Sequence, residues 1–328
     1  MPDRRGFVAA LSAAFASSLL PLRARAQAGA KTTRIIVGFA AGGGTDVLAR
    51  LMAERLRGSY APAVIVENRP GAAARIAVNY VKNGDADGSL MLFTPDFPFT
   101  VYPHSYKKLD YDPIRDFAAV ATLGQSNLVM SVGPAVPENV KSVRDFVQWC
   151  KANPGKASFA TTGAGATPHF VGVMLARSAG IDLTPIHYKG GAPALQDLLG
   201  GQVPMSVNPT SEVLPYLKSG KIRALGSSGT RRSRFTPDVP TIAESGYKDV
   251  VVEAWLGFFA PAKTPSATVA RLNAAIGNAL RSEEVVQNLA KFGVEPFITT
   301  PEQFAAIIRR DIDKWGPIVK ASGFTAED

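Results

Sequence analysis

Three consecutive glycines, Gly42 to Gly44, follow a short apolar run and come directly before Thr45 and Asp46. Because glycine has no Cβ, a ligand can approach the backbone closely at this point. A helical pattern begins at once, and the first turn of a helix carries unpaired N–H groups and the positive end of the helix dipole. This combination favours the binding of a carboxylate or another anion.

Three further loops have the same setting, because each stands between an apolar run and a helical pattern. They span residues 68–75, 161–169 and 188–193. Taken singly, each loop is better explained as a tight strand-to-helix turn. Four such loops in one chain favour a shared anion pocket.

These loops do not carry a nucleotide motif. Residues 42–46 lack the lysine of a Walker A sequence, and residues 163–168 lack the third glycine of a dinucleotide site. The hydrolase motif Gly-x-Ser-x-Gly and the zinc motif His-Glu-x-x-His are also missing from the sequence. The three histidines are too widely spaced for a local metal site: His104, His169 and His187. We therefore expect no catalytic residue, no metal and no cofactor.

The elements around the loops alternate between strand and helix. Short runs at 35–39, 64–66, 90–93, 123–132 and 157–160, the first of them rich in β-branched residues, predict strands, and helical periodicity follows most of them. This alternation predicts an α/β fold with a parallel sheet. Near the C-terminus, Thr264-Pro265 and Thr300-Pro301 each predict an N-cap followed by the first residue of a helix.

The first 28 residues have the features of a cleavable export signal. Arg4 and Arg5 precede a small apolar run, and Ala26 to Ala28 form a small-x-small cleavage site. The two arginines fit either the twin-arginine route or an ordinary Sec signal. Removing these residues lowers the formal net charge from +9 to about +6. The mature protein is therefore expected outside the cytoplasm, in the periplasm.

Two features of the composition argue against a protein held by disulfides and against a nucleic-acid-binding protein. Cys150 is the only cysteine, so no intramolecular disulfide forms, and its apolar helical neighbours predict a core position. The one basic run in the mature chain, residues 231–234, has no interleaved aromatic residue, so nucleic-acid binding is not expected.

A set of ordered motifs is similar to the Bug-type periplasmic solute-binding receptors of tripartite tricarboxylate transporters. The resemblance covers about 34–324, nearly the whole mature chain. Its markers are FAAGGGTD at 39–46, VENRPG at 66–71, YDP at 111–113 with Asp116-Phe117, PGK at 154–156, YKGGAPALQDLLGGQV at 188–203, GKIRAL at 220–225, DVPTIAESG at 238–246 and PAKTP at 261–265.

The resemblance implies a two-lobed periplasmic-binding-protein fold, each lobe a mainly parallel sheet flanked by helices. One lobe would span 29–130 plus 257–328 and the other 131–256, with two chain crossings as the hinge. The ligand would be a small organic acid (a dicarboxylate, a tricarboxylate or an aromatic acid) held in the interlobe cleft, mostly by backbone amides and hydroxyls. The partners would be the large and small permease subunits of the transporter, and the receptor itself would be a monomer.

The residues that this resemblance places at the ligand come from both lobes. They are Phe39, Ala41, Gly42, Gly43, Thr45, Asp46, Gly71, Ala72, Ala73, Arg75, Thr94, Thr161, Thr162, Gly163, Thr167, His169, Tyr188, Lys189, Gly190 and Asn208. For Asp46, capping of the following helix is expected alongside a role at the ligand.

Some residues depart from the family pattern. Relatives often carry Gly-Gly-Asn where this chain has Ala72 to Ala74, and the added Cβ atoms would narrow the approach to the backbone. Arg75 follows, and we weigh pairing with a ligand carboxylate, such as the distal one of a diacid, against a solvated surface position. Phe97 and Phe99 either wall the pocket or pack in the core. Asn208 stands where relatives more often carry Asp or another polar residue.

Two other functions stay open at this point. The same receptor could report to a sensor kinase and feed no transporter. An exported hydrolase on a similar fold is the other alternative, although the sequence offers no base paired with a serine.

Overall fold

The computed structural model describes residues 31–326, and the predicted export signal lies outside this range. The strands are β1 (Thr33–Val37), β2 (Val64–Asn68), β3 (Leu90–Pro95), β4 (Phe117–Val132), β5 (Ser158–Thr161), β6 (Thr184–His187), β7 (Met205–Pro209), β8 (Arg223–Ser227), β9 (Glu253–Pro261) and β10 (Glu295–Pro296). The helices are α2 (Gly44–Leu56), α3 (Arg75–Lys82), α4 (Phe97–Thr100), α5 (Tyr102–Ser105), α6 (Val143–Ala152), α7 (Thr167–Ala179), α8 (Gly191–Leu199), α9 (Thr210–Lys218), α10 (Ser266–Leu280), α11 (Glu283–Lys291) and α12 (Pro301–Ser322), with short 3-10 turns η1 (Ala72–Ala74) and η2 (Pro154–Lys156).

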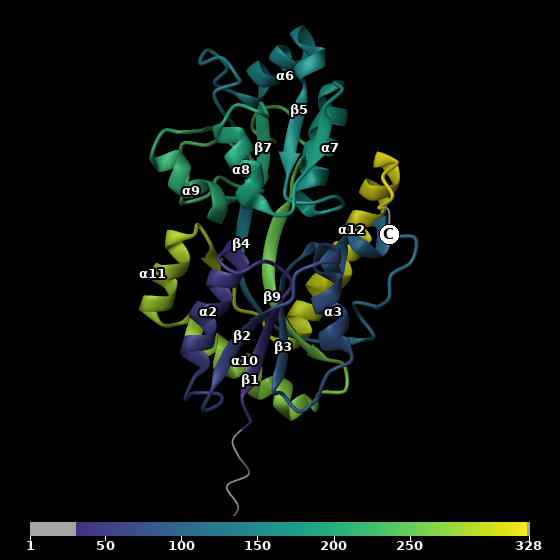
Figure 1. Cartoon of the computed structure of the whole chain (residues 1–328), viewed down its shortest axis with the longest axis vertical. Helices are drawn as coiled ribbons and strands as arrows, with labels where there is room; N and C mark the ends of the chain where they lie inside the picture. The colour runs from purple at the N-terminus through teal and green to yellow at the C-terminus, as the bar shows by residue number, and fades with distance from the viewer. Residues whose placement is uncertain (1–30, 327–328) are drawn as a thin grey trace, which may run out of the picture. The chain divides into compact units, whose positions relative to one another are not determined.

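The described strands form one sheet whose main path runs β2-β1-β3-β9-β4-β7-β5-β6 (Figure 1). The strands β2, β1 and β3 are parallel to one another, and so are β7, β5 and β6. Between these two groups, β9 and β4 are antiparallel to their neighbours. The predicted α/β class is confirmed. Parallel pairing is confined to the two ends of the sheet, where strand and helix alternate in the sequence.

The long strand β4 lies between the two strand groups and changes its partners along its length. Its residues 117–127 pair with β9, whereas 128–132 pair with β7 and β8. Register shifts interrupt both the β4–β9 and the β4–β8 pairing. A single continuous strand therefore links the β1–β3 group to the β5–β7 group.

Of the two predicted helix starts, the one at α12 is confirmed and the one at α10 needs a correction. Thr300 caps α12, since its side chain accepts from the Gln303 amide and the Gln303 side chain accepts from the Thr300 amide. At α10 the prediction was wrong by one residue, because Pro265 is the N-cap and Ser266 is the first helical residue.

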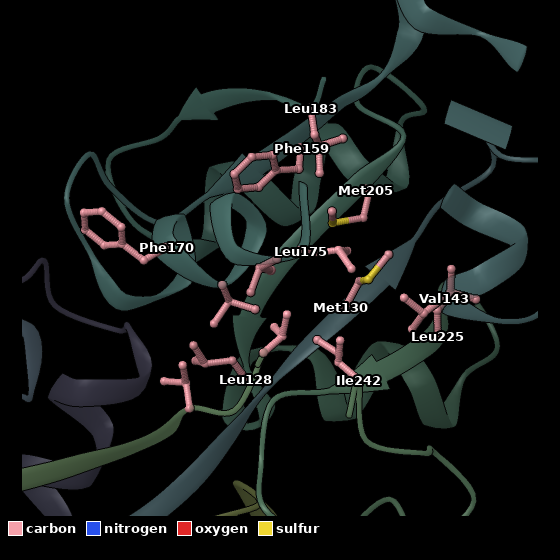
Figure 2. Close-up of a cluster of buried hydrophobic side chains, with 14 of the residues drawn as sticks. Leu128, Met130, Val143, Phe159, Phe170, Leu175, Leu183, Met205, Leu225 and Ile242 are labelled. Carbon is pink, nitrogen blue, oxygen red and sulfur yellow. The ribbon is translucent and has the colours of Figure 1, made fainter. Parts of the chain in front are cut away.

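Apolar side chains from these elements form several buried clusters. α2, α10 and α11 cover one face of the β1–β3 group, and α3 and α12 cover the other. A further cluster packs β4, β5 and β7 against α6 and α7; its labelled members in Figure 2 are Leu128, Met130, Val143, Phe159, Phe170, Leu175, Leu183, Met205, Leu225 and Ile242. Cys150 lies in this cluster, which confirms its predicted core position, and burial raises the pKa of its thiol to about 12.

Within residues 31–326, we find no helix that combines the length and the apolar character needed to cross a bilayer.

Candidate functional site

The first glycine loop is held by the carboxylate of Asp46. This side chain is buried, and its Oδ2 accepts from the Gly42 amide and from Arg50 Nε, both at 2.9 Å. Asp46 lies in the first turn of α2, and its side chain reaches back past the N-cap Gly43 to the amide of the preceding residue. Burial acts to raise the pKa of Asp46, but the bonds from Arg50, Gly42 and Asn68 outweigh it and hold this pKa below its ordinary value.

Asn68 ties this loop to the end of β2. Its Nδ2 donates to Asp46 Oδ1 at 2.8 Å and to the Phe39 carbonyl at 3.1 Å, while its Oδ1 accepts from Arg50 at 3.1 Å. The capping role expected for Asp46 is wrong, because Gly43 is the N-cap of α2 without a side-chain capping bond and Asp46 bonds to the amide before it. All three bonds of Asn68 serve the loop itself. Asn68 and Arg50 were not predicted as site residues, although Asn68 belongs to a quoted family motif.

The second loop packs directly against the end of β1. A Cβ placed on Gly38 would lie only 2.5 Å from Ala74 Cβ and 3.0 Å from Ala74 Cα. Because the strands β2, β1 and β3 are parallel, the loops that follow them meet at one edge of the sheet. The absence of a side chain on Gly38 lets the 38–46 and 69–75 loops touch there.

The three alanines of the second loop adopt left-handed backbone conformations. Their φ angles are 44° at Ala72, 52° at Ala73 and 72° at Ala74. This region costs roughly 1–2 kcal/mol for a residue that carries a Cβ. Strained backbone of this kind concentrates at functional sites, so the segment agrees with the predicted role of residues 71–73. Gly71, Ala72 and Ala73 are exposed.

Arg75 lies at the rim of these loops and is neither freely solvated nor buried. Its guanidinium carbon lies 4.2 Å from the centre of the Tyr106 ring, and its Nε donates to the Ala72 carbonyl at 3.2 Å. A cation–π contact and a backbone bond therefore fix its direction.

The loops after β5 and β6 are joined in the same way. The Gly190 amide donates to the Thr162 carbonyl and the Tyr188 amide donates to the Thr161 carbonyl, both at 3.0 Å. Thr162 and Gly163 are partly exposed and Lys189 is exposed. The hydroxyl of Tyr188 donates to Asp197 Oδ2 at 2.6 Å, so this hydroxyl is used within its own loop and helix.

Asn208 is fully buried at the end of β7 and organises the neighbouring loop. It accepts from Ser206 Oγ and donates to Glu212 Oε2 at 3.0 Å. The Glu212 carboxylate lies against Gly191 at the start of α8, where a Cβ on that glycine would collide with it. Burial raises the pKa of Glu212, although the bond from Asn208 opposes the rise. Glu212 was not predicted as a site residue.

Two contacts bring the loops of the two strand groups together. Thr167 Oγ1, at the start of α7, donates to Asp96 Oδ2 at 2.7 Å, and both residues are buried. A Cβ placed on Gly44 would lie 3.5 Å from Ser211 Oγ, at the start of α9. Neither contact joins two predicted site residues: Thr167 was predicted and its partner Asp96 was not, and Gly44 only neighbours the predicted Gly43 and Thr45. Asp96 and Ser211 were missed, since no local pattern marks a side chain that acts across the fold.

His169 is packed among aromatic rings. Its ring centre lies 4.7 Å from that of His187 and 4.8 Å from that of Phe324, and its Nδ1 accepts from the Gly165 amide at 3.3 Å. Burial, followed by the effect of His187, lowers the pKa of His169 to about 3. It is therefore a neutral residue that supports the 163–169 loop.

The two phenylalanines left open by the sequence have different environments. Phe99 is fully buried and stacks on Phe259 with ring centres 3.8 Å apart, which is a core position. Phe97 packs edge-on against Phe39, with ring centres 6.1 Å apart, and also contacts Tyr102. Only Phe97 reaches the predicted ligand loops, through Phe39.

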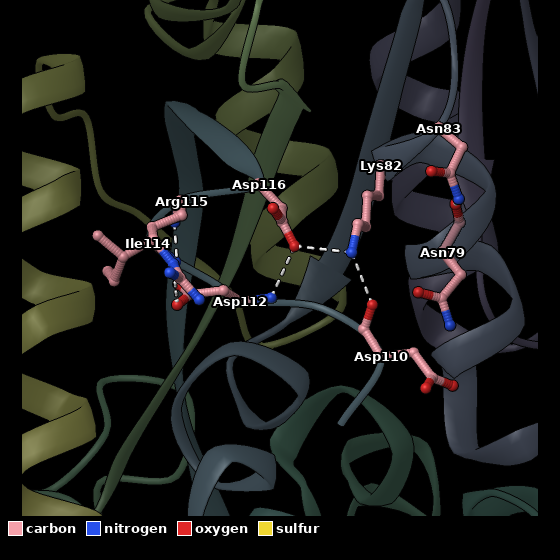
Figure 3. Close-up of polar contacts among 8 residues, drawn as sticks. All are labelled: Asn79, Lys82, Asn83, Asp110, Asp112, Ile114, Arg115 and Asp116. Carbon is pink, nitrogen blue, oxygen red and sulfur yellow. Dashed lines mark hydrogen bonds and ion pairs between the residues drawn. The ribbon is translucent and has the colours of Figure 1, made fainter. Parts of the chain in front are cut away.

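A hollow of about 560 Å³ lies away from these loops, around residues 109–116. Figure 3 shows the polar contacts among some of the residues there. Lys82 Nζ lies 2.9 Å from Asp116 Oδ2 and donates to the Asp110 carbonyl at 2.7 Å. Asp112 Oδ2 accepts from Arg115 Nε at 2.7 Å. Three carboxylates and two already paired cations line this hollow, so its charge does not favour an anion.

In the part of the chain that the structure describes, no group of three His, Cys, Asp or Glu side chains could hold a metal ion.

Comparisons with known proteins agree with this architecture. Residues 48–324 match the family described as "Tripartite tricarboxylate transporter family receptor". Protein BugT of Bordetella pertussis is 34% identical over 295 residues, which cover 90% of each chain. Among solved structures, an R. palustris protein with adipate has a TM-score of 0.84 and 30% identity, and covers 90% of this chain and 98% of its own. MatC from Rhodopseudomonas palustris with bound malate has a TM-score of 0.80 and 28% identity, and covers 88% and 98%.

Proposed function

The chain belongs to the family of tripartite tricarboxylate transporter receptors, and from this premise we propose that it captures a small organic carboxylate and delivers it to the membrane subunits of such a transporter. The ligand would be a dicarboxylate, a tricarboxylate or an aromatic acid. The observation that carries the proposal is that the anion-favouring loop at 161–169 meets the end of β3 across the two strand groups, at the bond between Asp96 and Thr167. Two similar structures were solved with malate and adipate.

We infer that the two strand groups act as lobes, 29–130 plus 257–328 and 131–256. β4 and β9 join the groups and would serve as the hinge. A ligand that contacts both lobes favours the closed arrangement by its higher affinity for it. The permease would then recognise the closed receptor.

Backbone amides would supply most ligand contacts. The segments 41–43, 71–73 and 162–163 support this role, because they are exposed or partly exposed and contain small side chains. Thr45 and Thr94 would add hydroxyls. Asp46 and Asn208 would act mainly by holding these segments in place. We also propose that the signal at 1–28 directs export of the protein, that it acts in the periplasm, and that it is a monomer.

A screen of organic acids by thermal shift, followed by isothermal titration of the hits, tests this function. We expect at least one C4–C6 dicarboxylate, citrate-like acid or aromatic acid to raise the melting temperature in a concentration-dependent way. A ligand at 100 times its Kd stabilises by about 2.7 kcal/mol. The methyl ester of each hit is the control, since it keeps the size and removes the charge. An unchanged melting temperature across the whole panel, or equal binding of the esters, would contradict the proposal.

Replacing Arg75 by alanine tests whether this side chain contacts the ligand. We expect affinity for a carboxylate found in the screen to fall about tenfold, the loss typical of a hydrogen bond to a charged group. Titration calorimetry gives the value, and Arg57→Ala, at an exposed arginine after α2, is the matched control. Equal affinities of wild type and Arg75→Ala would mean that Arg75 packs against Tyr106 and does not contact the ligand.

A further inference from the structure

The carboxyl of Asp96 has an unusual position for a protein that binds acids. Asp96 follows β3 and precedes α4, and it is only 3% exposed. Its Oδ2 accepts from Thr167, and its neighbour Phe97 contacts Phe39. Asp96 therefore lies beside two residues that we assign to the ligand site, Thr167 directly and Phe39 through Phe97.

Within residues 31–326, no ion pair neutralises this carboxyl. The other charged group that acts on it is Asp311 of α12, which itself accepts from Trp255 Nε1 at 2.9 Å and pairs with Arg310. Burial raises the pKa of Asp96 to about 7, and Asp311 adds to the rise while the bond from Thr167 opposes it. A negative charge in this place is costly, and a second one beside it would be more so.

A second buried group nearby lacks a partner. Thr94 is two residues before Asp96 at the same strand end, it is 1% exposed, and its Oγ1 has no hydrogen-bond partner among the described residues. A buried hydroxyl without a hydrogen-bond partner is unfavourable. A polar, uncharged ligand group would satisfy it.

We propose that Asp96 determines specificity by rejecting a second carboxylate at the inner end of the site. The inference rests on the proposed function and narrows its ligand class. The preferred ligand carries one carboxylate, held by the glycine and alanine loops, and an uncharged polar end, such as a hydroxyl, that faces Asp96 and Thr94. A hydroxyl can donate to the Asp96 carboxylate and accept from Thr94, whereas a carboxylate is repelled by the first of these groups.

Matched pairs of acids test this assignment. Each pair has the same chain length and differs only at one end: 4-hydroxybutyrate and succinate, 5-hydroxypentanoate and glutarate, 6-hydroxyhexanoate and adipate. We expect wild type at pH 8 to bind at least one of these pairs. Within that pair, its affinity for the hydroxy acid should exceed its affinity for the diacid. Asp96→Asn should shift that preference toward the diacid by about tenfold or more, because like charges placed together at an interface lower the affinity by more than tenfold. Asn keeps an oxygen that accepts from Thr167, so the packing is retained.

A control separates charge from other effects. Asp182→Asn removes an exposed carboxylate between α7 and β6 and should leave the preference unchanged. The same preference in wild type and Asp96→Asn would overturn the inference while the proposed function stands. Failure of every acid to bind either protein would overturn both.

Discussion

Gly38→Ala should unfold at a markedly lower denaturant concentration than wild type and lose affinity for the acid ligand. The added Cβ would meet Ala74 Cβ at 2.5 Å and Ala74 Cα at 3.0 Å, both far closer than van der Waals contact. These atoms belong to a backbone-fixed residue that already has a left-handed conformation, so they cannot swing aside as a long side chain could. Overpacking of this kind typically costs 1–3 kcal/mol. The 71–75 loop, which we assign to ligand binding, would be displaced as well.

A second substitution should reverse much of this loss. Ala74→Gly removes the Cβ that Gly38→Ala would strike, and it also relieves the φ of 72° at that position. We therefore expect the double variant to be more stable than Gly38→Ala alone, with a coupling of about 1 kcal/mol or more between the two sites. Gly155→Ala is the control, since nothing lies within 4 Å of its added Cβ. Additive effects of the two changes in urea unfolding would show that the contact between the loops is absent in solution.

The stability of wild type and of Asp96→Asn should diverge as the pH rises. The folded-state pKa of Asp96 is about 7, above the ordinary 3.8, so the folded protein holds this proton more tightly than the unfolded chain does. The contribution of Asp96 to the free energy of unfolding is fully present below about pH 4 and is lost as the pH rises to about 7. Above that pH the free energy of unfolding no longer changes because of this group. Asn does not titrate, so the variant lacks this loss. Between pH 5 and pH 8 the variant should gain about 3 kcal/mol relative to wild type, at about 1.4 kcal/mol per pKa unit.

Urea unfolding at several pH values between 5 and 8.5 measures this divergence without any ligand. Asp182→Asn, at an exposed position, should follow wild type throughout. Parallel curves for wild type and Asp96→Asn would mean that the buried carboxyl does not titrate in this range. That result would contradict the raised pKa of Asp96.

The sequence predicted the local elements of this protein well. The alternation of short strand-like runs with segments of helical periodicity predicted the α/β class, and Thr300-Pro301 predicted the start of α12. These predictions succeed because the signals lie within a few residues of the structure that they specify. The glycines of 42–44 indicated a backbone open to a ligand, and that segment is exposed or partly exposed in the structure.

The sequence could not decide which polar side chains face a ligand and which hold the loops. Asp46 and Asn208 were predicted at the ligand, yet their side chains bond to Gly42, Arg50 and Asn68, and to Ser206 and Glu212. These partners lie on neighbouring strand ends or on the following turn. Only the folded chain brings the bonding atoms within reach.

By itself the sequence determined the family, the class of fold and the segments that can meet an anion, because each of these depends on residue types at short spacing. Tertiary structure alone decided that Asp96 meets Thr167 across 71 positions, that Gly38 must have no side chain beside Ala74, and that Phe97 but not Phe99 reaches Phe39. Contacts of that kind depend on sheet order and on the packing of distant segments, which no local pattern encodes.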